Sequence, residues 1–151
     1  MRTPDFALEL VEAVVQATSL DVTLKMRLGW DDNSLNAPEI AKRAEAAGVK
    51  MITVHGRTRC QFYKGAADWQ AIGRVKRAVS IPVIANGDIV DVTSARQALQ
   101  QSGADGVMVG RGAQGAPWRL AQIASALYGT PAPKIPRGSD LAQVILQHHQ
   151  A

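Results

Sequence analysis

Short apolar runs alternate along the chain with segments whose apolar positions recur at helical spacing. Four runs have the length and composition of buried strands, at residues 22–28, 51–55, 83–85 and 106–109. The intervening segments carry helix start signals, and glycine or proline follows their last turns. The start signals are Thr3-Pro4, Asn36, Asp68 and Asp91. Strands that alternate with helices predict an α/β fold with four parallel strands.

Two further helices are expected after the last strand. Pro117 starts the first, which ends at Gly129, and Ser139-Asp140 caps the second. The proline- and glycine-rich segment between them is expected to be a linker. We therefore divide the chain into residues 1–129, a linker at 130–138, and the start of a C-terminal helical region at 139–151.

Polar residues and glycines gather where each expected strand ends. Successive clusters are separated by about one βα unit, so all four should emerge at the same rim of a parallel sheet. Four such units make half of a (β/α)8 TIM barrel, a fold of about 250 residues. A doubly wound sheet is the alternative, but the turn after the first strand, 29–32, lacks its glycine-rich fingerprint. The clusters are Lys25 and Arg27, His55, Asn86-Gly87-Asp88 and Gly110-Arg111-Gly112.

The cluster after the last strand has the chemistry of an anion site. Backbone N–H groups of Gly110 and Gly112 can approach an anion closely, and the Arg111 guanidinium can bind phosphate oxygens. A glycine-rich turn with a solvated arginine is the alternative. Lys25 and Arg27 share one strand face, which is either the barrel lumen or an outer face along which both extend to solvent.

Composition adds weaker constraints. The chain has 151 residues, a net charge of +4 and one cysteine, Cys60, which excludes an internal disulfide and a cysteine-rich zinc motif. No apolar run approaches the ~20 residues of a membrane helix, so we expect a cytoplasmic protein without membrane contact. His148 and His149 are expected to be exposed and not metal ligands, and no metal site is expected. Residues 57–64 form a basic loop with aromatic rings that suits phosphates and bases, or an ordinary loop.

The sequences and the order of several blocks of residues resemble those of the bacterial tRNA-dihydrouridine synthases. That resemblance implies FMN-dependent reduction of uridine to 5,6-dihydrouridine in tRNA, with NADPH as reductant. By the same resemblance, Lys25 lies at the N1/O2 edge of the flavin and His55 also holds it. The blocks are residues 25–30, 55–59, 67–69, 84–89 and 109–112. The resemblance further assigns Asn86, Gly87 and Asp88 to the ribityl and phosphate path, Gly110 and Arg111 to the phosphate, and Arg27, Arg59 and Tyr63 to the substrate.

The chain departs from that family in one block. The family's proton-donor cysteine lies in an Asn-x-Gly-Cys-Pro-like block that is absent, and Cys60 is in another loop. We expect a fragment, truncated at both ends, that contains the C-terminal half of the barrel and has little or no activity alone. Its open edges and uncovered apolar lumen face predict self-association. The alternatives are another FMN- or phosphate-binding barrel, similar to dihydroorotate dehydrogenase, and a non-catalytic flavin- or RNA-binding half barrel.

Overall fold

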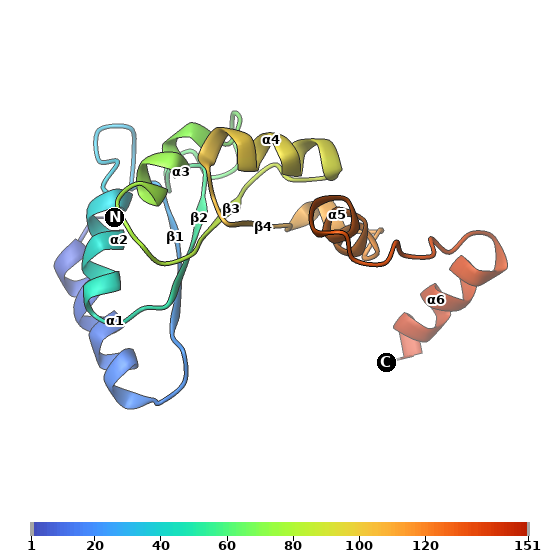
Figure 1. The fold of residues 1–151 in the computed structure, drawn as a ribbon, viewed down its shortest axis with the longest axis horizontal. Helices are drawn as coiled ribbons and strands as arrows, with labels where there is room; N and C mark the ends of the chain where they lie inside the picture. The colour runs from blue at the N-terminus through green and yellow to red at the C-terminus, as the bar shows by residue number, and fades with distance from the viewer. Residues whose placement is uncertain (1, 151) are drawn as a thin grey trace.

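A single parallel sheet organises the molecule. The computed structural model describes residues 2–150, and Figure 1 shows the order of the elements. The strands are β1 (Thr23–Arg27), β2 (Met51–His55), β3 (Val83–Asn86) and β4 (Gly106–Met108). All neighbouring pairs are parallel, and the order in the sheet is β1-β2-β3-β4. The four expected strands and their parallel pairing are confirmed.

Helices connect the strands and continue beyond them. The N-caps of α3 and α4 are those that the sequence indicates: Asp68 accepts a hydrogen bond from the backbone N–H of Ala71, and Asp91 forms a capping box with Ser94. Gly103 ends α4 in the left-handed conformation. The helices are α1 (Pro4–Ala17), α2 (Ala37–Ala46), α3 (Trp69–Lys76), α4 (Val92–Ser102), the 3₁₀ turn η1 (Arg111–Ala113), α5 (Arg119–Tyr128) and α6 (Ser139–Gln150).

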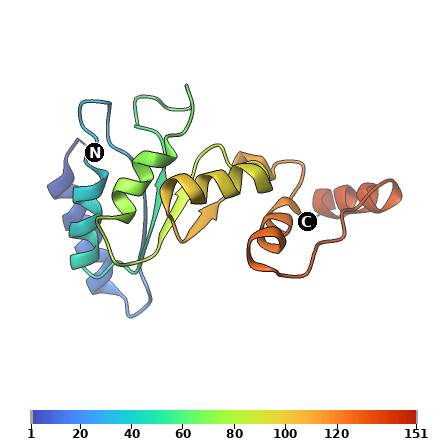
Figure 2. The ribbon, with the colours of Figure 1, turned by 45° about the horizontal axis from the view of Figure 1, so that its top comes forward.

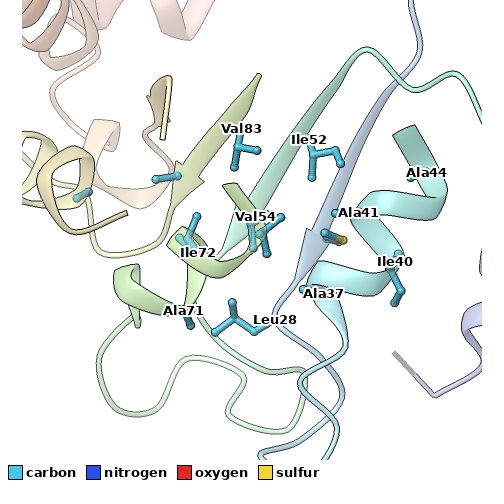
Figure 3. Packing of buried hydrophobic residues seen from close by; sticks show 14 of the residues in the cluster. Leu28, Ala37, Ile40, Ala41, Ala44, Ile52, Val54, Ala71, Ile72 and Val83 are labelled. Atoms are coloured by element: carbon cyan, nitrogen blue, oxygen red, sulfur yellow. The ribbon is translucent and has the colours of Figure 1, made fainter. Parts of the chain in front are cut away.

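The strand order distinguishes a barrel from a doubly wound sheet. Each strand pairs with its successor in the chain, whereas a doubly wound sheet reverses its order at a switch point. The apolar core lies between the sheet and α2, α3 and α4, where side chains such as Ile40, Ile72 and Ala95 are inaccessible or nearly so. Figure 3 shows Ile52, Val54 and Val83 of the sheet facing the same core. These features indicate half of a barrel with its helices outside.

The face of the sheet opposite the helices is more polar than expected. Lys25, Thr53 and Ile84 are register partners across three strands, and Arg27, His55 and Asn86 form the next row. Register partners in a parallel sheet point to the same side. The prediction of an apolar lumen face was therefore wrong. Cationic, hydroxyl and amide side chains point to this face, and along each strand they alternate with core residues that point to the helices.

The C-terminal elements differ in detail from the expectation. Helix α5 begins at Arg119, two residues after Pro117, with Trp118 as its N-cap. Residues 130–138 contain no helix or strand before α6 begins. No side chain of α6 is buried, and Figures 1 and 2 both place this helix apart from the sheet. Within residues 2–150 no helix is long and apolar enough to cross a bilayer.

We predict that the isolated chain self-associates. Among the described residues β1 and β4 each pair on one side only, so each has an outer edge with unpaired backbone groups. Exposed apolar side chains add to this tendency, including Val144, Ile145 and Leu146 on α6. Size-exclusion chromatography with light scattering at micromolar concentration should show dimers or larger species. A soluble monomer under those conditions contradicts the prediction.

Candidate functional site

A cavity of about 640 Å³ opens where the four strands end. Ligand cavities in proteins commonly measure roughly 300–1,000 Å³. The sequence predicted that the strand ends would meet at one rim, and the structure confirms that they do. Of the ten site residues named from the sequence, all except Arg59 line the cavity. The nine are Lys25, Arg27, His55, Tyr63, Asn86, Gly87, Asp88, Gly110 and Arg111.

Hydrogen bonds between strand ends hold the floor of the cavity. The side-chain Nδ2 of Asn86, at the end of β3, donates to the carbonyl of Met108 on β4 at 2.9 Å. The backbone N–H of Gly56 donates to the Asn86 carbonyl at 3.0 Å. The nearly buried Asn86 therefore ties the ends of three strands together, which fixes the spacing of the side chains around it.

Arg57 and Asp88 form an ion pair beside the cavity. The Arg57 residue is 2% exposed, and its two terminal nitrogens donate to the Asp88 carboxylate at 2.9 and 2.7 Å. Its guanidinium also donates to the carbonyls of Lys64 and Gly65 at 3.1 and 2.6 Å. Arg57 is thus unavailable to a phosphate in solution, and for this residue the structure favours the ordinary-loop alternative. Its donors are consumed within the protein.

The pair also holds an unusual backbone conformation. Asp88 has φ of 55°, a left-handed conformation that non-glycine residues seldom adopt. Its carboxylate accepts from the Ala67 backbone N–H at 2.8 Å in addition to Arg57. Burial by itself raises the pKa of Asp88, but the hydrogen bonds from Arg57 and Ala67 outweigh it and lower the pKa. The carboxylate is ionised and neutralised by Arg57.

The cavity has a positive electrostatic character. Burial, followed by the charge of Arg27, lowers the pKa of Lys25. Burial and the charges of Arg27, Lys25 and Arg57 lower the pKa of His55 to about 4, against a smaller opposing effect of Asp88. At pH 7 the imidazole is neutral. Because Asp88 is already paired with Arg57, the cations that line the cavity have no anionic partner among the lining residues.

Tyr63 lies between two of these cations. Its ring centroid is 5.8 Å from the Arg27 guanidinium and 4.5 Å from that of Arg111. Arg27 also donates to the carbonyls of Thr58 and Phe62, at 2.8 and 2.9 Å. The loop after β2 is therefore fastened to the end of β1 and to the loop after β4. Tyr63 closes one side of the cavity.

Arg59 lies elsewhere on this loop. Its guanidinium carbon is 5.5 Å from the Phe62 ring centroid, the residue is exposed, and it does not line the cavity. Cys60 is exposed next to it and also lies outside the cavity lining. His148 and His149 on α6 are exposed as expected.

Two glycines permit close packing at the rim. Gly87 has φ of 108°, and a Cβ there would lie 2.8 Å from Cδ2 of His55. A Cβ on Gly112 would lie 2.6 Å from the backbone oxygen of Ile89. Larger residues at either position would push the imidazole or the loop after β4 out of place.

Several lining residues were missed by sequence reasoning. Ile89, Val90, Met108 and Gln114 complete the wall. None of them is charged, and of the four only Ile89 lies in a block that carries the family resemblance. Trp69, at the start of α3, donates its indole N–H to the Gly87 carbonyl at 3.0 Å. Met108 is the register partner of Asn86, so both residues point to the same face of the sheet. The alternation along β4 is the one sequence signal that could have indicated this.

Solved structures with the same architecture belong to TIM-barrel enzymes. A phosphonopyruvate hydrolase complex with oxalate and Mg²⁺ aligns with a TM-score of 0.60 and 21% identity, over 85% of this chain and 48% of that chain. A mandelate oxidase variant aligns with a TM-score of 0.53 and 29% identity, over 93% of this chain and 36% of that one. These matches support the α/β, TIM-barrel-type fold.

Sequence relatives identify the family. A probable tRNA-dihydrouridine synthase of Rhodobacter capsulatus is 69% identical over the whole chain, which spans 47% of that protein. The tRNA-dihydrouridine synthase B of Vibrio cholerae is 46% identical over 98% of the chain and 46% of its own length. The chain thus spans about half the length of these curated relatives. The dihydrouridine synthase family model matches residues 1–151, and the chain belongs to this family.

Proposed function

We propose that the cavity binds FMN and that the protein serves the FMN-dependent reduction of uridine to 5,6-dihydrouridine in tRNA, with NADPH as reductant. One observation carries the proposal: nine residues assigned to flavin or substrate line a single cavity at the strand ends. The family membership adds tRNA dihydrouridine synthesis as the reaction class. FMN, when bound, supplies hydride transfer chemistry.

The residues present fit a ligand with a dianionic phosphate at one end. Lys25, Arg27 and Arg111 supply cations, while the one carboxylate in the lining, Asp88, is neutralised by Arg57. Gly110 and Gly112 flank Arg111 in the loop after β4, and a Cβ on Gly110 would meet nothing within 4 Å, which leaves room for phosphate oxygens to approach the backbone there. Barrel enzymes commonly bind phosphate at their last βα loops.

Individual roles are those that the family resemblance implies, and the shared cavity lining supports them. Gly110 and Arg111 would hold the phosphate, and Asn86, Gly87 and Asp88 would line the ribityl path. By the same resemblance Lys25 would contact the N1/O2 edge of the ring and stabilise negative charge there. His55 would contact the same ring as a neutral hydrogen-bonding group. Arg27 and Tyr63 at the wall would contact the substrate.

A proton donor is not provided by the cysteine of this sequence. Cys60 is exposed and does not line the cavity. We therefore propose that this chain alone binds FMN without reducing uridine at a useful rate. Dihydrouridine formation by the purified chain with FMN, NADPH and tRNA would contradict that proposal.

Titration of FMN fluorescence with the purified chain tests flavin binding. We expect saturable quenching by FMN and at least about tenfold weaker binding of riboflavin, which lacks the phosphate that Arg111 would contact. Arg74→Ala serves as the control, since Arg74 is an exposed cation on α3 that does not line the cavity, and this variant should retain wild-type affinity for both flavins. Absence of saturable FMN binding by a folded chain would contradict the proposal.

Binding of tRNA is expected to involve the exposed loop after β2. Arg59 and Lys64 are exposed there, next to the exposed rings of Phe62 and Tyr63, a composition that suits contacts with phosphates and unstacked bases. Arg59→Ala should weaken tRNA binding and reduce the slope of log K against log salt by about 0.7–0.9.

Fluorescence anisotropy with labelled tRNA at several salt concentrations measures both quantities. Arg74→Ala is the matched control, because Arg74 is an exposed cation on α3 that does not line the cavity. If both variants lose the same affinity, the positive charge acts only through the net charge of the chain and the loop is not the contact.

A further inference from the structure

We propose that Arg57 is a positioning residue for His55: the Arg57–Asp88 pair fixes the neutral imidazole in the tautomer with its proton on Nδ1, which then donates into the cavity. Which ligand atom accepts the hydrogen bond from His55 Nδ1 depends on the proposed FMN function. The orientation and tautomer of His55 are properties of the chain itself.

The Nε2 side of the His55 ring faces Arg57. An Arg57 Nη1 lies 3.4 Å from His55 Nε2. A guanidinium has only donors, so it stabilises a lone pair on the atom it faces. A proton on Nε2 would point at these N–H groups and be repelled. The neutral ring therefore keeps its lone pair on Nε2 and its proton on Nδ1.

The same edge of the ring packs against Gly87. A Cβ built on Gly87 would lie 2.8 Å from His55 Cδ2 and 3.0 Å from Nε2, so the backbone of Gly87 covers this edge of the ring. His55 nevertheless lines the cavity. None of the hydrogen bonds found among residues 2–150 uses Nδ1. The Nδ1–Cε1 edge is thus the one that the ring offers to a ligand.

Arg57 is itself held in place. Besides facing His55, its guanidinium is held by both carboxylate oxygens of Asp88 and by the carbonyls of Lys64 and Gly65. The three residues that hold it belong to two different loops. Such a bidentate and fully used guanidinium cannot turn away when a ligand enters.

The surrounding charges keep the ring neutral. The charged groups that face it are Arg27 and Lys25 on β1, Arg57 on its own loop, and Asp88 on the loop after β3. Burial first, and then three cations against one anion, favour loss of the imidazole proton and lower the pKa of His55 to about 4. A neutral Nδ1–H donor selects a ligand atom with a free lone pair, such as a carbonyl oxygen or an unprotonated ring nitrogen.

Long-range ¹H–¹⁵N correlation NMR of the ¹⁵N-labelled chain at pH 7, without ligand, tests the tautomer directly. His55→Gln assigns the His55 signals among the three histidines. We expect a pyrrole-like Nδ1 and a pyridine-like Nε2. A protonated Nε2, or the averaged shifts of an imidazolium, would overturn the inference.

Variants then test the role of Arg57. In Arg57→Met the proton should redistribute to Nε2, and the pKa of His55 should rise because a neighbouring cation is lost, although burial, Arg27 and Lys25 still hold it below its usual value. Arg57→Lys keeps a donor and should preserve more of the Nδ1–H form, whereas Arg59→Met should leave the His55 spectrum unchanged. An unchanged tautomer in Arg57→Met would overturn the positioning role.

The two proposals fail in different ways. If the wild-type spectrum shows the Nδ1–H tautomer and FMN does not bind, the flavin function is wrong while the positioning of His55 stands. If FMN binds and the proton is on Nε2, the positioning inference is wrong and the flavin function stands. Should Arg57→Met fail to fold, the wild-type spectrum and Arg57→Lys still decide the matter.

Discussion

Arg57→Met is expected to lower the free energy of unfolding by about 3 kcal/mol, at the lower end of the range for breaking a buried ion pair by removing one partner. The guanidinium is almost completely buried and makes hydrogen bonds to Asp88, Lys64 and Gly65. The lower end applies because the Asp88 side chain is 33% exposed and can be partly rehydrated. Urea denaturation followed by circular dichroism measures the change.

Two further variants separate the pair from its surroundings. Arg59→Met removes an exposed arginine two positions along the same loop and should change the stability by less than about 0.5 kcal/mol. The double variant Arg57→Met/Asp88→Asn should lose clearly less than the sum of the two single losses, because it leaves no buried charge unpaired. Additive losses would show that the two side chains act independently.

Arg111→Ala is expected to weaken FMN binding about 10- to 100-fold, the effect of losing charge-assisted hydrogen bonds to a phosphate. The Tyr63 ring, 4.5 Å from the guanidinium, helps to hold Arg111 at the cavity. Isothermal titration calorimetry with FMN gives the dissociation constants. The exposed position of Arg111 means that folding should be unaffected.

Riboflavin provides the control for this variant. Because riboflavin has no phosphate, its affinity should be nearly the same for wild type and Arg111→Ala. Equal losses for FMN and riboflavin would mean that Arg111 acts on the ring or on the shape of the cavity. Arg111→Lys should recover part of the FMN affinity, since lysine keeps the charge without the planar fork.

The positions of the strands and their convergence could be read from the sequence. Parallel strands joined by helices must end at one rim, so Lys25, His55, Asn86 and Arg111 were placed together without any knowledge of their contacts. Local signals were equally reliable where the chemistry is local, as in the caps at Asp68 and Asp91.

The burial of Arg57 and the exposure of Arg59 could not be predicted from the sequence. These arginines are two residues apart in one loop, yet one is buried and the other exposed. The difference arises from Asp88, which lies 31 positions away in the sequence and reaches Arg57 only when β2 and β3 pair. No local pattern distinguishes a guanidinium that will find a buried carboxylate from one that will not.

The lumen face was misjudged for a different reason. Thr53 and His55 alternate with Ile52 and Val54 in β2, a period-two signal that indicates one polar face. The alternation of Lys25 and Arg27 with apolar residues in β1 carries the same signal, and both side chains lie on the face that was expected to be apolar. Polar and charged side chains on this face are what the proposed binding of a phosphate-bearing ligand requires.

A crystal structure of the chain with bound FMN is the most direct test of the central claim. We expect the phosphate at Gly110 and Arg111, the ring at the end of β1 with its N1/O2 edge near Lys25, and the Nδ1 side of His55 toward the ligand. FMN bound outside the cavity, or bound in it with the phosphate at Lys25 and the ring at Arg111, would contradict the account.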